Sequence, residues 1–346
     1  MEKFPINTRN TSLVITLAAL VIILAGVKYA ESIISPLLVA LFITAISGPA
    51  MMWLTQKKVP SGLAVTIIIF CILVIGFFIS SVLSTSLNGF SQNLPDYQAR
   101  LQEITGTLLS AANKTGFHMP MKELSQMFDL GKVMAFVGST FNQVLGTLTN
   151  IFFILMMVIF LLLELSGFRY KLKAISNDPG QTMADLINVS NTISSYFKIK
   201  TFTSVLTAIP IIIVLSLMGI DFPILWGMVA FLLNFVPNIG SIIAAIPVVL
   251  MALIQFGFIA AGEVILLYLI MNNLVGNFIE PRVMGRSLGL STLIVFLSLV
   301  FWGWLLGPVG MFLSVPLTMT LKIVMDNNDD TRWISVMLSN EGESSK

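Results

Sequence analysis

The sequence has few charged residues. Only 10% of its 346 residues are Asp, Glu, Lys or Arg, whereas 56% are hydrophobic and the mean hydropathy is +0.93. A soluble globular protein carries about 25% charged residues, so this class is excluded. The apolar runs are continuous over about 17 to 27 residues, which is typical of membrane helices and not of the alternating ten-residue strands of an outer-membrane barrel. We therefore expect an all-α integral membrane protein.

Residues that carry enzyme chemistry are also scarce. The single cysteine, Cys71, lies in an apolar run and cannot form an intrachain disulfide, and the single histidine, His118, lies near no cysteine or carboxylate cluster. The phosphate-cradling sequence Gly-x-x-x-x-Gly-Lys is absent, which argues against an ATP-driven pump. We expect no enzyme activity, no metal, no cofactor and no nucleic-acid partner. Transport would draw on an ion gradient or on the gradient of the solute itself.

Two apolar stretches in the second half, 222–256 and 288–325, are too long for one membrane helix. A straight helix crosses the hydrocarbon with roughly 20 residues. The stretches are broken by Pro237 and Gly240 in the first, and by Gly307, Pro308 and Gly310 in the second. Paired broken segments are the best indication of a transporter's binding site, because irregular backbone at membrane depth is covered by protein or lines a cavity. We expect two re-entrant-type helical hairpins, although two complete crossings at each break would leave the chain ends on the same sides.

The chain is expected to hold about eight membrane segments. Single spans are predicted at about 11–28, 32–54, 60–86, 149–165, 201–219 and 258–279, in addition to the two broken stretches. The N-terminus, the turn at 55–59 and the loop at 166–200 are rich in Lys and Arg, so the positive-inside rule places them in the cytoplasm. Continuing the count places the C-terminus there too, and the two hairpins then enter from opposite sides as inverted repeats.

The first apolar run resembles a signal peptide because it follows the basic residues Lys3 and Arg9. Lys28 stands where cleavage would need a small residue, so we expect an uncleaved first helix.

These spans divide the chain into five parts. They are the first three membrane helices (1–86), an extracytoplasmic amphipathic region (87–148), a fourth span with a basic cytoplasmic loop (149–200), a transport core with both hairpins (201–326) and a cytoplasmic tail (327–346). The loop contains a looser amphipathic pattern at 183–197, which we expect to lie along the inner membrane interface.

The extracytoplasmic region shows two helical patterns. Apolar residues at 94–108 recur every three or four positions, and those from Met127 to Leu148 keep a strict heptad seam. Two interpretations are open: the two helices pack on each other or on the bilayer, or the second one joins copies of the chain into a homo-oligomer.

The span at 258–279 is the most polar. At 100° per residue Asn273, Asn277 and Glu280 fall on one face, which suits an ion or a solute rich in hydroxyl groups. The alternative is that these groups hydrogen-bond the exposed backbone of the breaks. The other predicted solute contacts lie in or beside the first break: Asn234, Asn238 and Ser241.

Several charged residues are candidates for coupling or gating: Glu280, Arg282, Arg286 and Glu263. Proline 281 ends the helix, and a basic pair at a helix C-terminus complements its dipole, so a role in anchoring competes with an ion pair between Glu280 and an arginine.

Three segments carry a family resemblance: Pro237-Asn-Ile-Gly-Ser241, Glu280-Pro-Arg-Val-Met-Gly-Arg-Ser-Leu-Gly-Leu-Ser291 and Leu305-Leu-Gly-Pro-Val-Gly-Met-Phe-Leu-Ser-Val-Pro316. They resemble signatures of the autoinducer-2 exporter family, the PerM-like permeases. The resemblance implies a bacterial inner-membrane protein that exports autoinducer-2, a small hydroxyl-rich furanone signal. Other relatives are credited with sodium(lithium)/proton antiport, so H⁺ or Na⁺ is an alternative partner, with Glu280 or Glu263 as the titrating group. A membrane scaffold assembled through the heptad helix is a third interpretation.

Overall fold

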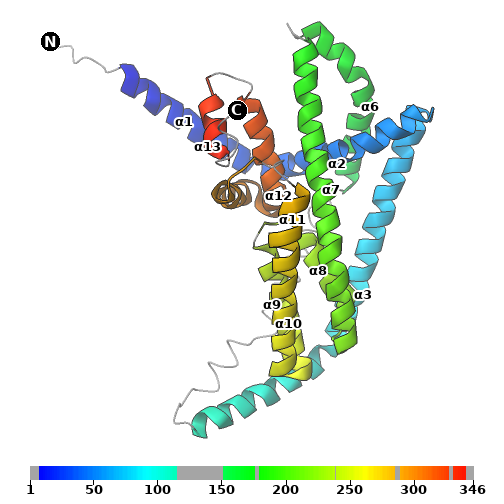
Figure 1. Ribbon diagram of the computed structural model, residues 1–346, viewed down its shortest axis with the longest axis vertical. Coiled ribbons are helices and arrows are strands. Elements are labelled where there is room, and N and C mark those ends of the chain that lie inside the picture. The colour runs from blue at the N-terminus through cyan, green and yellow to red at the C-terminus, as the bar shows by residue number, and fades with distance from the viewer. Residues whose placement is uncertain are drawn as a thin grey trace, which may run out of the picture.

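The computed structural model describes residues 8–114, 151–175, 179–237, 239–284, 289–326 and 330–339, and all regular secondary structure within them is helical (Figure 1). Among the described residues, five helical segments are long and apolar enough to cross a membrane: Glu31–Gln56, Ser61–Phe90, Ile187–Met218, Phe258–Met284 and Thr292–Asp326. The expected all-helical membrane fold is confirmed. The total of about eight membrane segments stays a prediction.

The described residues of the first half form four helices. They are α1 (Thr8–Tyr29), α2 (Glu31–Gln56), α3 (Ser61–Lys114) and α6 (Ile151–Ile175). Helix α3 differs from the sequence prediction, because it runs without a break from the predicted span into the amphipathic segment at 94–108. Gly89 does not end the helix but gives room for a close contact, since a Cβ there would lie 2.8 Å from the ring of Phe222. Phe90 and Tyr97 are buried against the first hairpin, so this segment packs on protein. The heptad series from Met127 to Leu148 and His118 lie outside the described residues.

Helix α7 (Pro179–Met218) also joins two predicted elements into one. The apolar residues Ile193, Tyr196 and Phe197 are buried in a cluster with α2 and the second hairpin. This part of α7 therefore packs on protein and continues directly into the segment that ends at Met218, and its position at the membrane interface stays a prediction.

The first broken stretch folds back as a hairpin of α8 (Pro223–Leu233) and α9 (Gly240–Phe256). Its two ends meet, since the Asp221 N–H donates to Gln255 Oε1 (3.1 Å). Phe222 (φ 58°) and Gly257 (φ 84°) take left-handed conformations where the chain turns into and out of the hairpin. The next helix, α10 (Phe258–Met271), runs beside α9 and leads into a π-helix, η1 (Asn272–Ile279), and α11 (Glu280–Met284).

The second broken stretch, α12 (Thr292–Asp326), reverses at Gly307, whose φ of 62° and ψ of −149° are not helical. Its two arms are joined where Trp302 Nε1 donates to Thr318 Oγ1 (3.0 Å). The ends again meet, because Lys322 Nζ donates to the Gly289 carbonyl (2.8 Å). A short helix, α13 (Arg332–Leu338), packs on these ends. Both breaks therefore reverse the chain as the sequence predicted, and their depth in a membrane remains a prediction.

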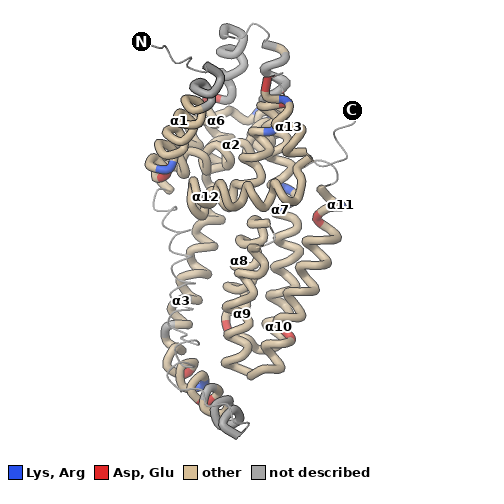
Figure 2. The backbone as a smooth tube through the Cα atoms, turned by 90° about the vertical axis from the view of Figure 1, so that its left-hand side faces the viewer, with Lys and Arg blue, Asp and Glu red and all other residues tan. Residues whose placement is uncertain are grey.

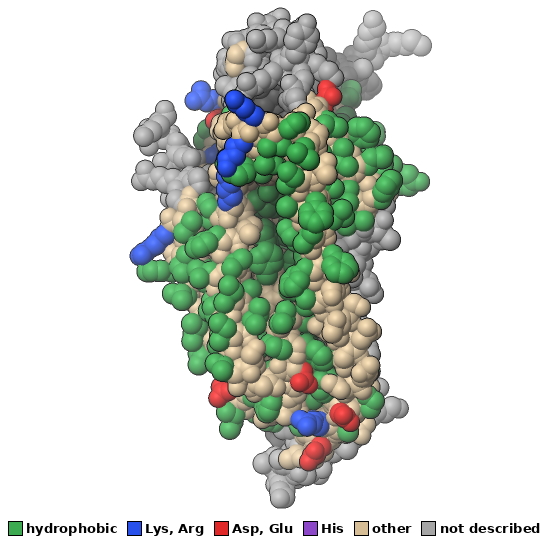
Figure 3. Space-filling view, turned by 90° about the vertical axis from the view of Figure 1, so that its right-hand side faces the viewer, with side chains coloured by type: hydrophobic (Ala, Val, Ile, Leu, Met, Phe, Trp, Pro, Cys, Tyr) green, Lys and Arg blue, Asp and Glu red, His purple; other side chains and the backbone are tan. Residues whose placement is uncertain are grey.

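Charged residues gather toward the two ends of the molecule, and the part between them carries few charges (Figure 2). Large apolar side chains cover much of the face seen in Figure 3. Exposed large apolar side chains of the described residues include Phe77, Leu217 and Ile259. Such a surface is suited to lipid and not to water.

Candidate functional site

The tip of the first hairpin meets α7, α10 and η1 around a small cavity. Its volume is about 10 Å³, just enough for one water molecule. Five of its eight lining residues have polar side chains, although it lies within an apolar helical assembly. The lining residues are Thr207, Ala230, Asn234, Ser241, Tyr268, Met271, Asn272 and Gly276.

The tip is held by hydrogen bonds to its neighbours. Asn234, which ends α8, donates through Nδ2 to Ser204 Oγ on α7 (3.0 Å). Ser241, in the first turn of α9, donates to Asn272 Oδ1 on η1 (3.1 Å). The reversal between the arms is tight, because a Cβ at Gly240 would lie 1.8 Å from the Leu233 carbonyl oxygen. Asn234 and Ser241 thus both reach the cavity, whereas Asn238 lies outside the described residues.

A buried ion pair lies next to this tip. Lys200 Nζ on α7 is 2.5 Å from Glu280 Oε1, and their side chains are 5% and 16% exposed. The same ammonium group donates to the backbone carbonyl of Asn234 (3.2 Å). Lys200 therefore connects α7, the hairpin tip and the residue that follows η1. The ion pair and the hydrogen bond together offset part of the free-energy cost of removing both charges from water.

The partner of Glu280 differs from the arginines expected from the sequence. Arg282 instead lies over the ring of Phe278, 3.7 Å from its centroid. Arg286 lies outside the described residues. Glu263 is exposed in α10, 17 positions before Glu280, and does not reach the site.

Tyr268, Met271 and Asn272 line the cavity at the spacing of one α-helical face, and a π-helix follows from Asn272 onward. Its hydrogen bonds close at i→i+5, so one turn takes more than four residues. In a π-helix, residues four positions apart share a face, which groups Asn272, Gly276 and Glu280. Residues three positions apart, such as Asn277 and Glu280, no longer do so. Asn273 and Asn277 lie on the exposed side, where Asn277 Nδ2 donates to Asn273 Oδ1 (3.1 Å). The predicted face of Asn273, Asn277 and Glu280 assumed α-helical turns; the structure keeps the two asparagines together, whereas Glu280 pairs with Lys200.

The site contains residues that the sequence reasoning missed, chiefly Lys200, Thr207, Tyr268 and Asn272. A signal for α7 existed: Thr203, Ser204 and Thr207 place small polar groups on one side of an apolar helix. Lys200 was counted only as a loop charge that sets orientation.

The two hairpins meet through aromatic rings. Phe235 at the first tip stacks on Phe312 in the second hairpin, with centroids 4.7 Å apart. Phe197 on α7 lies 6.1 and 6.3 Å from these rings. The second tip itself lies against α2, where Ser35 Oγ donates to the Leu306 carbonyl (3.4 Å). Movement of either hairpin would therefore disturb the other.

A separate polar cluster holds the two ends of the first hairpin together. It involves the part of α3 that follows the candidate membrane span Ser61–Phe90. The Tyr97 hydroxyl donates to Asp221 Oδ2 (2.6 Å), which also accepts from Gln255 Nε2. Burial, and then the hydrogen bond to the Asp221 carboxylate, raises the pKa of Tyr97 to about 12. Arg100 on the same helix donates to the Gln255 carbonyl (3.1 Å).

Replacing Tyr97 by phenylalanine is expected to lower the free energy of unfolding by about 1 to 3 kcal/mol, because a carboxylate loses a buried donor. The raised pKa means that the contribution of the hydroxyl is complete below about pH 10 and is lost as the pH rises through about 12. Thermal unfolding of the purified protein between about pH 6 and 9 should therefore show a constant difference from the unmodified chain. Tyr29→Phe is the control, since Tyr29 is 94% exposed. Equal melting temperatures for Tyr97→Phe and the unmodified chain would contradict the expectation.

Comparison with known proteins finds a family of membrane transporters and several relatives described as transport proteins. A family model described as "AI-2E family transporter" matches residues 17–329. A putative transport protein of Haemophilus influenzae is 39% identical over 330 residues, 93% of this chain and 94% of that protein. The AI-2 transport protein TqsA of Escherichia coli K12 is 38% identical over 339 residues, 98% of both chains. The putative transport protein YhhT of the same organism is 36% identical over 338 residues, 98% of this chain and 97% of that protein. The family resemblance expected from the three motifs is confirmed.

Proposed function

The chain belongs to the AI-2E transporter family and is a membrane transport protein, and we propose that it exports AI-2, a small hydroxyl-rich signal, across the bacterial inner membrane. The similarity to TqsA supports this solute, since that relative is named an AI-2 transport protein. The proposal keeps the topology predicted from the charges, with both termini in the cytoplasm.

The observation that carries the proposal is the polar cavity at the first hairpin tip. Its polar walls are hydroxyl and amide groups, which both donate and accept hydrogen bonds. Charged side chains do not line it, and the neighbouring Lys200 and Glu280 neutralise each other. Such walls suit an uncharged solute that carries several hydroxyl groups.

The cavity is too small to hold such a solute, so the structure corresponds to a closed site. Opening it requires the tip to leave α7 and η1, which breaks the hydrogen bonds from Asn234 to Ser204 and from Ser241 to Asn272. We infer that movement of the first hairpin exposes the site, in line with the broken-helix transporters in which one structural repeat moves against the rest.

The sodium/proton alternative has no support from the relatives or from the two candidate carboxylates. The three relatives above are described as transport proteins, one of them for AI-2, and none as an antiporter. Glu263 lies away from the site, and Glu280 is already paired with Lys200. Assembly into a homo-oligomer through the heptad segment stays a prediction.

Two adjacent asparagines provide the test. Asn272→Ala is expected to lower AI-2 flux in proteoliposomes by about tenfold, because it removes a hydrogen-bonding group from the cavity and the partner of Ser241. Asn273→Ala makes the same chemical change one position along, on the exposed side, and is expected to keep the flux. The reverse result, with flux lost only in Asn273→Ala, would place the solute elsewhere. Equal melting temperatures in detergent would show that both variants fold.

A further inference from the structure

Two tyrosine hydroxyls in the described part of the chain are buried and have no hydrogen-bond partner: those of Tyr196 and Tyr268. A buried hydroxyl without a partner has lost its hydrogen bonds to water and is rare in native proteins, so each instance needs an explanation. The two residues differ in their surroundings. Only Tyr268 lines the cavity at the hairpin tip.

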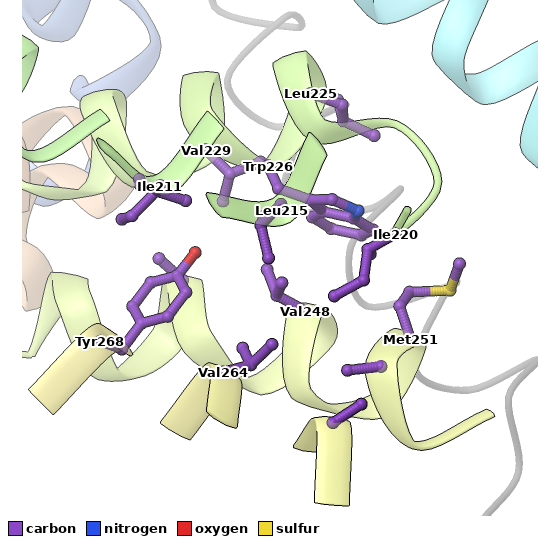
Figure 4. Packing of buried hydrophobic residues seen from close by; sticks show 14 of the residues in the cluster. Ile211, Leu215, Ile220, Leu225, Trp226, Val229, Val248, Met251, Val264 and Tyr268 are labelled. Atoms are coloured by element: carbon purple, nitrogen blue, oxygen red, sulfur yellow. The ribbon is translucent and has the colours of Figure 1, made fainter. Parts of the chain in front are cut away.

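The Tyr268 side chain extends from α10 toward α7, beside the cavity that the residue lines (Figure 4). The residue lies on α10 and is 6% exposed. In Figure 4 its oxygen points away from α10 toward α7, where Ile211 lies. Tyr196 lies on α7, where its ring contacts Phe197 edge to face at 5.5 Å in the cluster beside the second hairpin. The two residues are thus a matched pair, one in the site and one outside it.

Three of the other polar side chains around the cavity each donate one hydrogen bond to a described residue. Thr207 donates to the Thr203 carbonyl (2.9 Å), Ser241 to Asn272 Oδ1, and Asn234 to Ser204 Oγ. Their oxygen lone pairs remain as acceptors, so the walls offer several acceptors. The Tyr268 hydroxyl adds a donor that no described residue uses. A solute hydroxyl can satisfy both at once, because it donates and accepts.

We propose that the Tyr268 hydroxyl is a specificity-determining contact of the transport site and hydrogen-bonds a hydroxyl group of an uncharged solute. This inference rests on the proposed function for the location of the site and adds the class of group recognised there. A site built to bind a hydroxyl discriminates strongly against an analogue that lacks it, since its polar groups are then left unpaired.

The test is a thermodynamic cycle on the full-length protein in detergent. AI-2 and its analogues that each lack one hydroxyl group are bound to the unmodified chain, to Tyr268→Phe and to Tyr196→Phe, with Kd measured by calorimetry. We expect the unmodified chain and Tyr196→Phe to prefer AI-2 over one analogue by about tenfold, about 1.4 kcal/mol, and Tyr268→Phe to bind the two alike. The inference would be overturned if Tyr268→Phe weakened the binding of AI-2 and of every analogue by the same factor, or if it weakened the binding of none of them.

The cycle is repeated with ribitol and its deoxy analogues if the unmodified chain does not bind AI-2. A Tyr268-dependent preference for ribitol then retains the inference while the AI-2 proposal fails. Binding of neither AI-2 nor ribitol overturns the inference as well.

Discussion

Replacing Lys200 by methionine is expected to abolish AI-2 transport and to lower the free energy of unfolding by about 3 to 5 kcal/mol. The change leaves the Glu280 carboxylate buried without its partner, and breaking a buried ion pair from one side typically costs this much. It also removes the donor to the Asn234 carbonyl, so the hairpin tip loses its connection to α7. Flux in proteoliposomes and chemical denaturation in detergent measure the two effects.

Two further variants make this test specific. Lys198→Met removes the same charge two positions earlier from an exposed side chain and should change stability by less than about 0.5 kcal/mol. The double change Lys200→Met with Glu280→Gln removes both charges and is expected to recover most of the lost stability, since a neutral pair carries no unpaired charge. A double variant that is less stable than Lys200→Met would contradict the ion pair.

The Gly240→Ala substitution is expected to destabilise the protein by about 3 kcal/mol or more and to stop transport. The added methyl group would lie 1.8 Å from the Leu233 carbonyl oxygen, and a backbone atom cannot move aside as a flexible side chain can. The arms of the first hairpin must then separate at their tip, where Asn234 and Ser241 line the cavity.

Gly262→Ala is the control for this substitution. It lies on the exposed side of α10 with no atom within 4 Å of the added carbon. Alanine is favoured over glycine inside a helix by about 1 kcal/mol, so this variant should be as stable as the original chain or slightly more stable. If the Gly240→Ala and Gly262→Ala proteins had the same melting temperature, the hairpin tip would be packed more loosely than the structure shows.

The positions of the breaks were predictable because their cause is local. Proline and glycine interrupt apolar stretches that are too long for one crossing, and both stretches do reverse there. The lengths of α3 and α7 were not predictable in the same way. A helix keeps its backbone period when its surface changes from apolar to polar, so polarity marked the edge of the apolar span and not the end of the helix.

The composition of the site depends on two features that one sequence does not show. The first is which face of the helix meets the cavity: Asn272 and Gly276 of the π-helix line it, whereas Asn273 and Asn277 are exposed. The second is tertiary contact between distant residues, since Lys200 and Glu280 are 80 positions apart in the chain. Asn234 and Ser241 were found because they flank the break itself, where the reversal of the chain brings both to the cavity.

The central claim is that solute binds at the first hairpin tip, and protection of that tip from a thiol reagent tests it most directly. Cys71 is the only cysteine in the sequence, so a Cys71→Ser protein has no thiol. Adding Ser241→Cys places a single thiol in the cavity wall. Adding Ser216→Cys instead places it on the exposed side of α7, as the control. Saturating AI-2 is expected to slow labelling of the Ser241→Cys protein by about tenfold, since binding reduces the fraction of unoccupied sites. It should leave the Ser216→Cys protein unchanged. Equal labelling rates with and without AI-2, in a Ser241→Cys protein that still transports it, would contradict the account.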